Sequence, residues 1–145
     1  MYKLRLMAVV LTVVVLLAVS GCGSDSPPFV DTGASYTDQD VTSVFGSVDA
    51  NSALGQPTAD APALRSAALG ALRGEGEAAA SAADLITRTF ASSTAGVPVY
   101  VERALFNGEQ ALIVVEAIGP KGGKLSDLRV WVIDETGEVL YSGTR

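Results

Sequence analysis

The spacing of hydrophobic positions divides the chain into segments with different expected structures. Over residues 60–92, apolar side chains recur three or four positions apart, which is the period of a helix with one buried face. Gly74 and Gly76 interrupt this run, so it predicts one kinked helix or a helical pair. Asp60 stands where a helix N-cap is expected, and Arg88 lies in the expected last turn, where a cation favours the helix dipole.

Beyond Gly96 the helical period ends, and the chain continues in apolar segments separated by turn residues, which are typical of β-strands. Asn107-Gly108 is a strong signal for a two-residue hairpin loop between the first two strands. The run 111–115 is continuously apolar, which indicates a central strand covered on both faces. Four strands are predicted, over residues 97–106, 109–118, 125–134 and 138–142.

These elements predict the α+β class, with a helix or kinked helical pair packed on a four-stranded antiparallel meander sheet. They would form one small domain over residues 60–145. Residues 22–59 differ, because they carry five Asp, neither Lys nor Arg, and a Pro-Pro pair. This composition predicts an acidic tether, in which Thr37 can cap a possible short helix at 38–46.

The first residues have the order of charges and apolar side chains that a targeting segment needs. Lys3 and Arg5 precede a run over 6–19 that is apolar apart from one Thr. This run is shorter than the about 20 residues that a membrane-spanning helix requires, and it suits a signal peptide. Val19, two small residues and Cys22 then follow. The whole order resembles the signal peptide and lipobox of bacterial lipoproteins.

The resemblance implies cleavage between Gly21 and Cys22, so that residues 1–21 are a lipoprotein signal peptide. It also implies a diacylglyceryl cysteine at Cys22, whose acyl chains, such as palmitate, hold the protein on a membrane. The mature protein is then expected on the outer face of the bacterial cell membrane, or on the outer membrane of a diderm cell. An ordinary signal peptide and an uncleaved anchor are the alternatives.

Composition narrows the chemistry and the partners. The chain has no His and a single Cys, so the commonest general base, a disulfide framework and a multi-Cys zinc site are excluded. Its net charge is −6, and removal of the signal peptide leaves 8 basic and 16 acidic side chains, a net −8, which argues against nucleic acid. We expect no metal and no cofactor. The expected partners are the membrane, through lipid on Cys22, and an envelope protein or cell-wall component.

One short segment carries a second resemblance. Residues 29–35, Phe-Val-Asp-Thr-Gly-Ala-Ser, are similar to the active-site signature of aspartic proteases. In that family the Asp is one half of a carboxylate dyad that shares a proton, and a homodimer can supply the other half. The resemblance implies that Asp31 is catalytic and that Thr32 and Gly33 support it. The alternative, which we favour, is that this segment is part of the polar tether.

Other polar residues of the predicted sheet do not form a catalytic set. The two-residue hairpin loop places Glu102 and Glu116 on opposite faces, and we expect both at an edge or in solvent. The glycine-rich loop 119–123, flanked by Lys124, lacks the spacing of a phosphate loop and predicts a hairpin connection. Three aromatic residues could form an exposed ligand patch but are expected in the core: Tyr100, Trp131 and Tyr141.

The function that these patterns favour is a lipid-anchored, non-enzymatic binding or interaction module of the cell envelope. One alternative is a small-ligand carrier or sensor ectodomain that uses a cleft between helix and sheet. The other is an aspartic-protease-like hydrolase that acts through Asp31.

Overall fold

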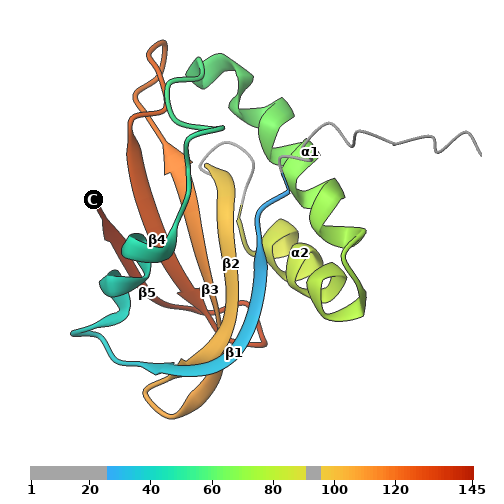
Figure 1. The fold of residues 1–145 in the computed structure, drawn as a ribbon, viewed down its shortest axis with the longest axis vertical. Coiled ribbons are helices and arrows are strands. Elements are labelled where there is room, and N and C mark those ends of the chain that lie inside the picture. Colours follow the sequence, from blue (N-terminus) through green and yellow to red (C-terminus); the bar gives the residue numbers. More distant parts are fainter. Residues whose placement is uncertain (1–25, 91–95) are drawn as a thin grey trace, which may run out of the picture.

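The computed structural model describes residues 26–90 and 96–145 of the chain. These residues form an α+β fold in which two helices cover one face of a five-stranded mixed sheet (Figure 1). The predicted signal peptide, its predicted cleavage site at Gly21 and the predicted lipidation site at Cys22 lie outside the described residues. Among the described helices, none has the length and hydropathy that crossing a membrane requires.

The sheet has the strand order β1-β2-β3-β4-β5, with β1 parallel to β2 and every other pair antiparallel. The strands are β1 Phe29–Tyr36, β2 Val97–Phe106, β3 Glu109–Ile118, β4 Asp127–Ile133 and β5 Val139–Thr144. The helices are α1 Ala61–Arg73 and α2 Glu77–Thr89, with shorter 3-10 helices η1 Val41–Ser47 and η2 Thr58–Asp60.

Strands β2 to β5 form the antiparallel meander that the apolar segments and turn residues predict. Phe106 pairs with Glu109, so the β2–β3 loop has two residues. These are Asn107 and Gly108, with φ of 51° and 86°, as a two-residue hairpin of this type needs. Gly137, in the turn before β5, also has a left-handed φ of 94°. The local turn chemistry therefore favours the β2–β3 and β4–β5 hairpins.

The prediction of a four-stranded, wholly antiparallel sheet was wrong in one strand. Residues 29–36, assigned to the tether, form β1 at the edge of the sheet and pair in parallel with β2. The pairing is interrupted between Asp31 and Ser35, where Gly33 has a φ of 66°. An exposed edge strand with such an irregularity has no continuous hydrophobic alternation, and a parallel partner needs no hairpin signal nearby.

The helical pair, one of the two predicted forms of residues 60–92, is the form observed. Gly76 separates α1 from α2 with a φ of 123°, a conformation that favours glycine. Asp60 stands at the N-cap of α1, but its side chain makes no capping hydrogen bond. Both helices pack on one face of the sheet, where Leu72 and Ile86 meet Val114 in a fully buried cluster.

The opposite face of the sheet is covered by η1 and the loop that follows it. Val41, Val44 and Phe45 of η1 are buried there, and the predicted short helix is of the 3-10 type. They pack in one cluster with Ile113 and Val130 of the sheet. Because both faces are covered, the central strand β3 is buried on both sides, as its apolar run predicts.

Candidate functional site

Glu116 of β3 is fully buried on the helix-covered face and is bound by four donors. Its Oε1 accepts from Arg65 Nη1 of α1 at 3.0 Å. Its Oε2 accepts from Arg129 Nη2 at 3.0 Å, from Trp131 Nε1 at 2.9 Å and from the Gly96 backbone N–H at 3.2 Å. This carboxylate therefore ties α1 to β3 and β4, and its oxygens are committed to that structural role.

Glu102 of β2 is buried on the opposite face and is bound by hydroxyl groups. Thr32 Oγ1 donates to its Oε1 at 3.1 Å. The hydroxyls of Tyr36 and Tyr100 donate to its Oε2 at 3.1 and 3.0 Å. Two of these donors belong to β1, so the Glu102 cluster fastens the edge strand to β2 by side chains as well as by backbone pairing.

The prediction that the two glutamates lie on opposite faces is confirmed. Glu102 pairs with Ile113, and the side chains of Ile113 and Glu116 point to opposite faces because side chains alternate along β3. The expectation that both lie at an edge or in solvent was wrong, since they are 2% and 0% exposed. Several of their partners come from β1 and α1, which are far away in sequence. Sequence spacing alone cannot bring such partners together.

The tyrosines that bind Glu102 should make stability fall at alkaline pH. Burial, together with the hydrogen bond and charge of Glu102, raises the pKa of Tyr36 and Tyr100 above the ordinary value of 10. The folded chain then keeps protons that the unfolded chain loses, so this stabilisation is complete below about pH 10 and is lost as pH rises through the folded-state values.

Urea unfolding between about pH 8 and pH 11 measures this effect. A variant with both Tyr36→Phe and Tyr100→Phe should be less stable at neutral pH and should show a smaller fall on the alkaline side. An equal fall in the wild type and the double variant would contradict the assignment.

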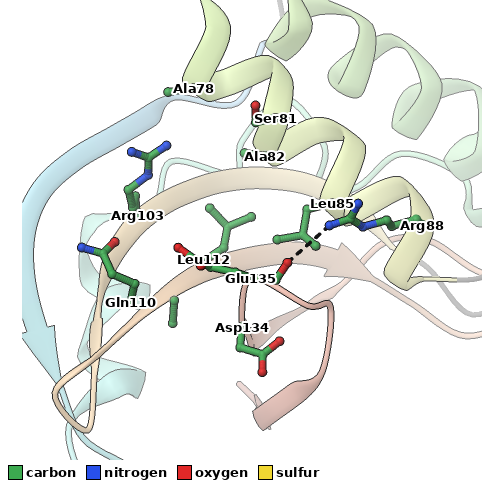
Figure 2. Close-up of a pocket in the computed structure, with 11 residues that line it drawn as sticks. Ala78, Ser81, Ala82, Leu85, Arg88, Arg103, Gln110, Leu112, Asp134 and Glu135 are labelled. Atoms are coloured by element: carbon green, nitrogen blue, oxygen red, sulfur yellow. Dashed lines mark hydrogen bonds between the residues drawn. The ribbon is translucent and has the colours of Figure 1, made fainter.

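An open pocket lies between α2 and the sheet, beside the β2–β3 hairpin and the β4–β5 turn (Figure 2). Its volume is about 290 Å³. Ala82 and Leu85 of α2 and Leu112 of β3 supply its apolar lining. A small, partly apolar concavity with a few polar groups is the usual form of a ligand site.

One side of the pocket is formed by Arg103 of β2 and Gln110 of β3 (Figure 2). Arg103 Nη1 lies 3.6 Å from Asp31 Oδ2, and both side chains are about half exposed. That separation is longer than a hydrogen bond, so charge alone holds the pair. A ligand oxygen can therefore take the place of Asp31 on this guanidinium at little cost.

The other side is formed by Arg88 of α2 and by the turn after β4. Arg88 Nη2 donates to the backbone carbonyl of Glu135 at 3.3 Å, which ties the end of α2 to this turn (Figure 2). Asp134 Oδ1 accepts from the hydroxyl and backbone N–H of Thr136 and from the Glu138 N–H. The Thr136 hydroxyl bond, with the backbone bonds, lowers the pKa of Asp134, which stays ionised.

This arrangement can bind and orient a ligand. Arginine keeps its proton in proteins, so Arg88 and Arg103 supply fixed positive charge and hydrogen-bond donors. A cleft between helix and sheet was one of the alternatives that the sequence suggested, but its lining residues were not predicted, because α2, β2 and the turn after β4 meet there only in the folded chain. The one available signal was an arginine, Arg103, within an otherwise largely apolar strand.

Asp31, the residue suggested by the protease-like signature, lies on the edge strand β1 next to Arg103. Thr32, which that resemblance makes a supporting residue, donates its hydroxyl to Glu102. Among residues 26–90 and 96–145, no group of three or more acidic, His or Cys side chains could hold a metal ion.

The loop 119–123 connects β3 to β4, so the predicted hairpin connection is confirmed. Its carbonyl groups bind the segment before α1: Thr58 N–H donates to Gly123 O at 2.9 Å and Thr58 Oγ1 to Pro120 O at 2.8 Å. The loop is therefore used for packing within the fold.

The three aromatic residues do not form one patch: Tyr100 is buried in the core, and Trp131 and Tyr141 are partly buried and pack against it. Trp131 packs on Phe90 on the helix-covered face, with ring centroids 4.9 Å apart. Tyr100 is buried on the opposite face, where Tyr141 contacts Phe106 at 6.2 Å between centroids. Strand alternation places these aromatic rings in different layers.

Comparison with known proteins found no match to the chain among protein-family models, curated proteins or solved structures.

Proposed function

We propose that this chain is a lipid-anchored cell-envelope protein that acts as a non-enzymatic binding module. The observation that carries the proposal is the pocket between α2 and the sheet, in which Arg88 and Arg103 flank an apolar lining. Fixed guanidinium groups beside apolar surface recognise an acidic group attached to an apolar body. The expected partner is an envelope protein or a cell-wall component.

The lipid anchor is supported by the lipobox-like order that ends in Cys22. A diacylglyceryl group on Cys22, joined by a further acyl chain, would hold the protein on a membrane far more firmly than one chain does. The described fold begins at Ser26, close in sequence to that residue. The proposed location is the outer face of the bacterial cell membrane, or the outer membrane in a diderm cell.

The non-enzymatic part of the proposal is supported by how the buried acids are used. Glu102 and Glu116 are held by internal donors, and neither lines the pocket. The hydrolase alternative needs a second carboxylate that shares a proton with Asp31. In the described part of the chain, the ion pair of Asp31 is with Arg103 instead.

Crosslinking in intact cells followed by mass spectrometry tests the anchor and the binding site together. The wild type should stay in the membrane fraction and capture a specific envelope partner, whereas Cys22→Ala should leave the membrane and lose the partner. Arg103→Ala should stay on the membrane but lose the partner, because its cation is removed from the pocket.

Arg73→Ala is the matched control, since Arg73 forms an exposed ion pair with Asp84 and does not line the pocket. It should capture the partner as the wild type does. Capture that is equally strong with Arg103→Ala would exclude the pocket as the binding site. Membrane retention of Cys22→Ala would exclude the lipid anchor.

The size of the pocket favours a second candidate, a small-ligand carrier or sensor ectodomain. Its volume of about 290 Å³ lies at the lower end of the range for ligand pockets. A stabilising ligand at 100 times its Kd should add about 2.7 kcal/mol to the free energy of unfolding. A partner that is a small molecule would appear in a thermal-shift screen and not as a crosslinked protein.

A further inference from the structure

The two arginines of the pocket between α2 and the sheet have different surroundings. Arg88 donates to the Glu135 carbonyl at 3.3 Å and stands beside Asp134 and Glu135, so acidic residues of the lining lie near its charge. Arg103 instead forms its ion pair with Asp31 of β1, a residue that does not line the pocket. The charge of Arg103 is therefore balanced from outside the pocket.

The backbone fixes the position of Asp31 beside Arg103. The two residues are partners in the parallel ladder of β1 and β2, so their side chains project from the same face of the sheet. Regular pairing stops after Asp31 and resumes at Ser35. The Asp31 Oδ2 stays 3.6 Å from Arg103 Nη1, which is beyond hydrogen-bond distance. Asp31 therefore neutralises the guanidinium through charge alone.

The Arg103 side chain points from β2 toward Ala78 and Ser81 in the first turns of α2 (Figure 2). Glu135 reaches toward Gln110 instead. An acidic group of a ligand is therefore expected between Arg103 and α2, where small side chains line the pocket. A carboxylate there can accept two N–H···O bonds from one guanidinium at about 2.7–2.9 Å. It gains hydrogen bonds that the existing ion pair lacks.

We propose that Asp31 determines the charge specificity of the pocket by competing with the ligand for Arg103. In the free protein the Asp31 carboxylate neutralises Arg103, and the acidic group of a ligand must displace it. An anionic group can replace that charge, whereas a neutral polar group cannot. This inference rests on the proposed function of the pocket as the binding site and gives Asp31 a role that needs no second carboxylate.

Isothermal titration calorimetry of the full chain, purified in detergent, measures this competition with N-acetyl-leucine, which joins one carboxylate to an apolar side chain. N-acetyl-leucinamide, which lacks the charge, is the neutral probe. Asp31→Asn should tighten binding of N-acetyl-leucine by about threefold to fivefold, because the probe no longer competes with a carboxylate. Binding of the neutral probe should not change, so the ratio of the two Kd values should shift by the same factor.

Asp84→Asn is the matched control, because it removes an acidic charge from the exposed surface of α2, where Asp84 is paired with Arg73 outside the pocket. It should leave both Kd values unchanged, which separates competition at Arg103 from an effect of net charge. Arg103→Ala should abolish the preference for the charged probe. Adding Asp31→Asn to Arg103→Ala should not restore that preference.

Three results would overturn the inference. The first is an unchanged Kd of N-acetyl-leucine in Asp31→Asn, and the second is equal tightening in Asp31→Asn and Asp84→Asn. The third is binding of N-acetyl-leucine to neither the wild type nor Asp31→Asn. If capture of the partner in cells still needs Arg103 in any of these cases, only the role of Asp31 is rejected and the binding function stands. Capture that does not need Arg103 would instead reject the proposed function itself.

Discussion

Replacing Glu116 with Gln should lower the free energy of unfolding by about 3–5 kcal/mol, because it leaves buried arginine charge without its counter-ion. Glu116 is fully buried, and Arg65, which is bound to its Oε1, has a side chain only 8% exposed. Gln retains the size of the side chain and one acceptor oxygen but removes the negative charge. Urea unfolding at neutral pH measures the loss.

The control for this variant is Asp84→Asn, which removes the carboxylate of an ion pair on the helix surface. Arg73 and Asp84 are 41% and 67% exposed, so water screens their charges. The expected loss is below about 1 kcal/mol. Equal losses in Glu116→Gln and Asp84→Asn would mean that the buried pair contributes no more than the exposed one.

A double variant separates charge from packing. Arg65→Met combined with Glu116→Gln removes the buried positive charge of α1 together with the negative charge that neutralises it. The loss in the double variant should be smaller than the sum of the two single losses, since the residues interact directly. Additive losses would mean that the two side chains contribute independently.

Gly119→Ala should cost about 3 kcal/mol of unfolding free energy, because the chain leaves no space for a methyl group at this position. A Cβ there would overlap the Lys124 carbonyl oxygen and would lie 2.8 Å from its carbonyl carbon. Both are backbone atoms of the β3–β4 connection, so no side-chain rotation can relieve the contact. Thermal and urea unfolding both measure the effect.

Gly70→Ala is the matched control and should have the opposite sign. Gly70 lies within α1, is exposed, and has open space where a Cβ would be added. Alanine there should add about 0.5–1 kcal/mol by favouring the helix. If Gly119→Ala were as stable as the wild type, the close approach of residues 119 and 124 would be wrong.

The sequence predicted the elements whose signals are local. Asn107-Gly108 specified the β2–β3 hairpin through the backbone conformations it allows, and Gly76 marked the break between the helices. β1 could not be found in this way, because its pairing with β2 spans the whole helical segment. The polar and glycine residues of β1 are compatible with an edge strand and with a linker, so composition does not distinguish the two.

The candidate site was predictable to a smaller extent than the fold. The alternation of β2 and β3 correctly separated Glu102 from Glu116. It could not show that each glutamate is buried, since the hydroxyls of β1 and the guanidinium of α1 arrive from other parts of the chain. The pocket depends in the same way on where α2 meets the turn after β4.

The edge position of β1 has a mechanical consequence for a protein held by its N-terminal side. The chain enters the sheet at Phe29, and Asp31 of β1 pairs with the pocket residue Arg103 of β2. A pull between the proposed membrane anchor and a bound ligand would therefore act along these two parallel strands. Such a force acts parallel to the strands, so all the backbone hydrogen bonds between β1 and β2 resist it together. The Glu102 cluster, which joins the same strands, would raise the force needed to separate them.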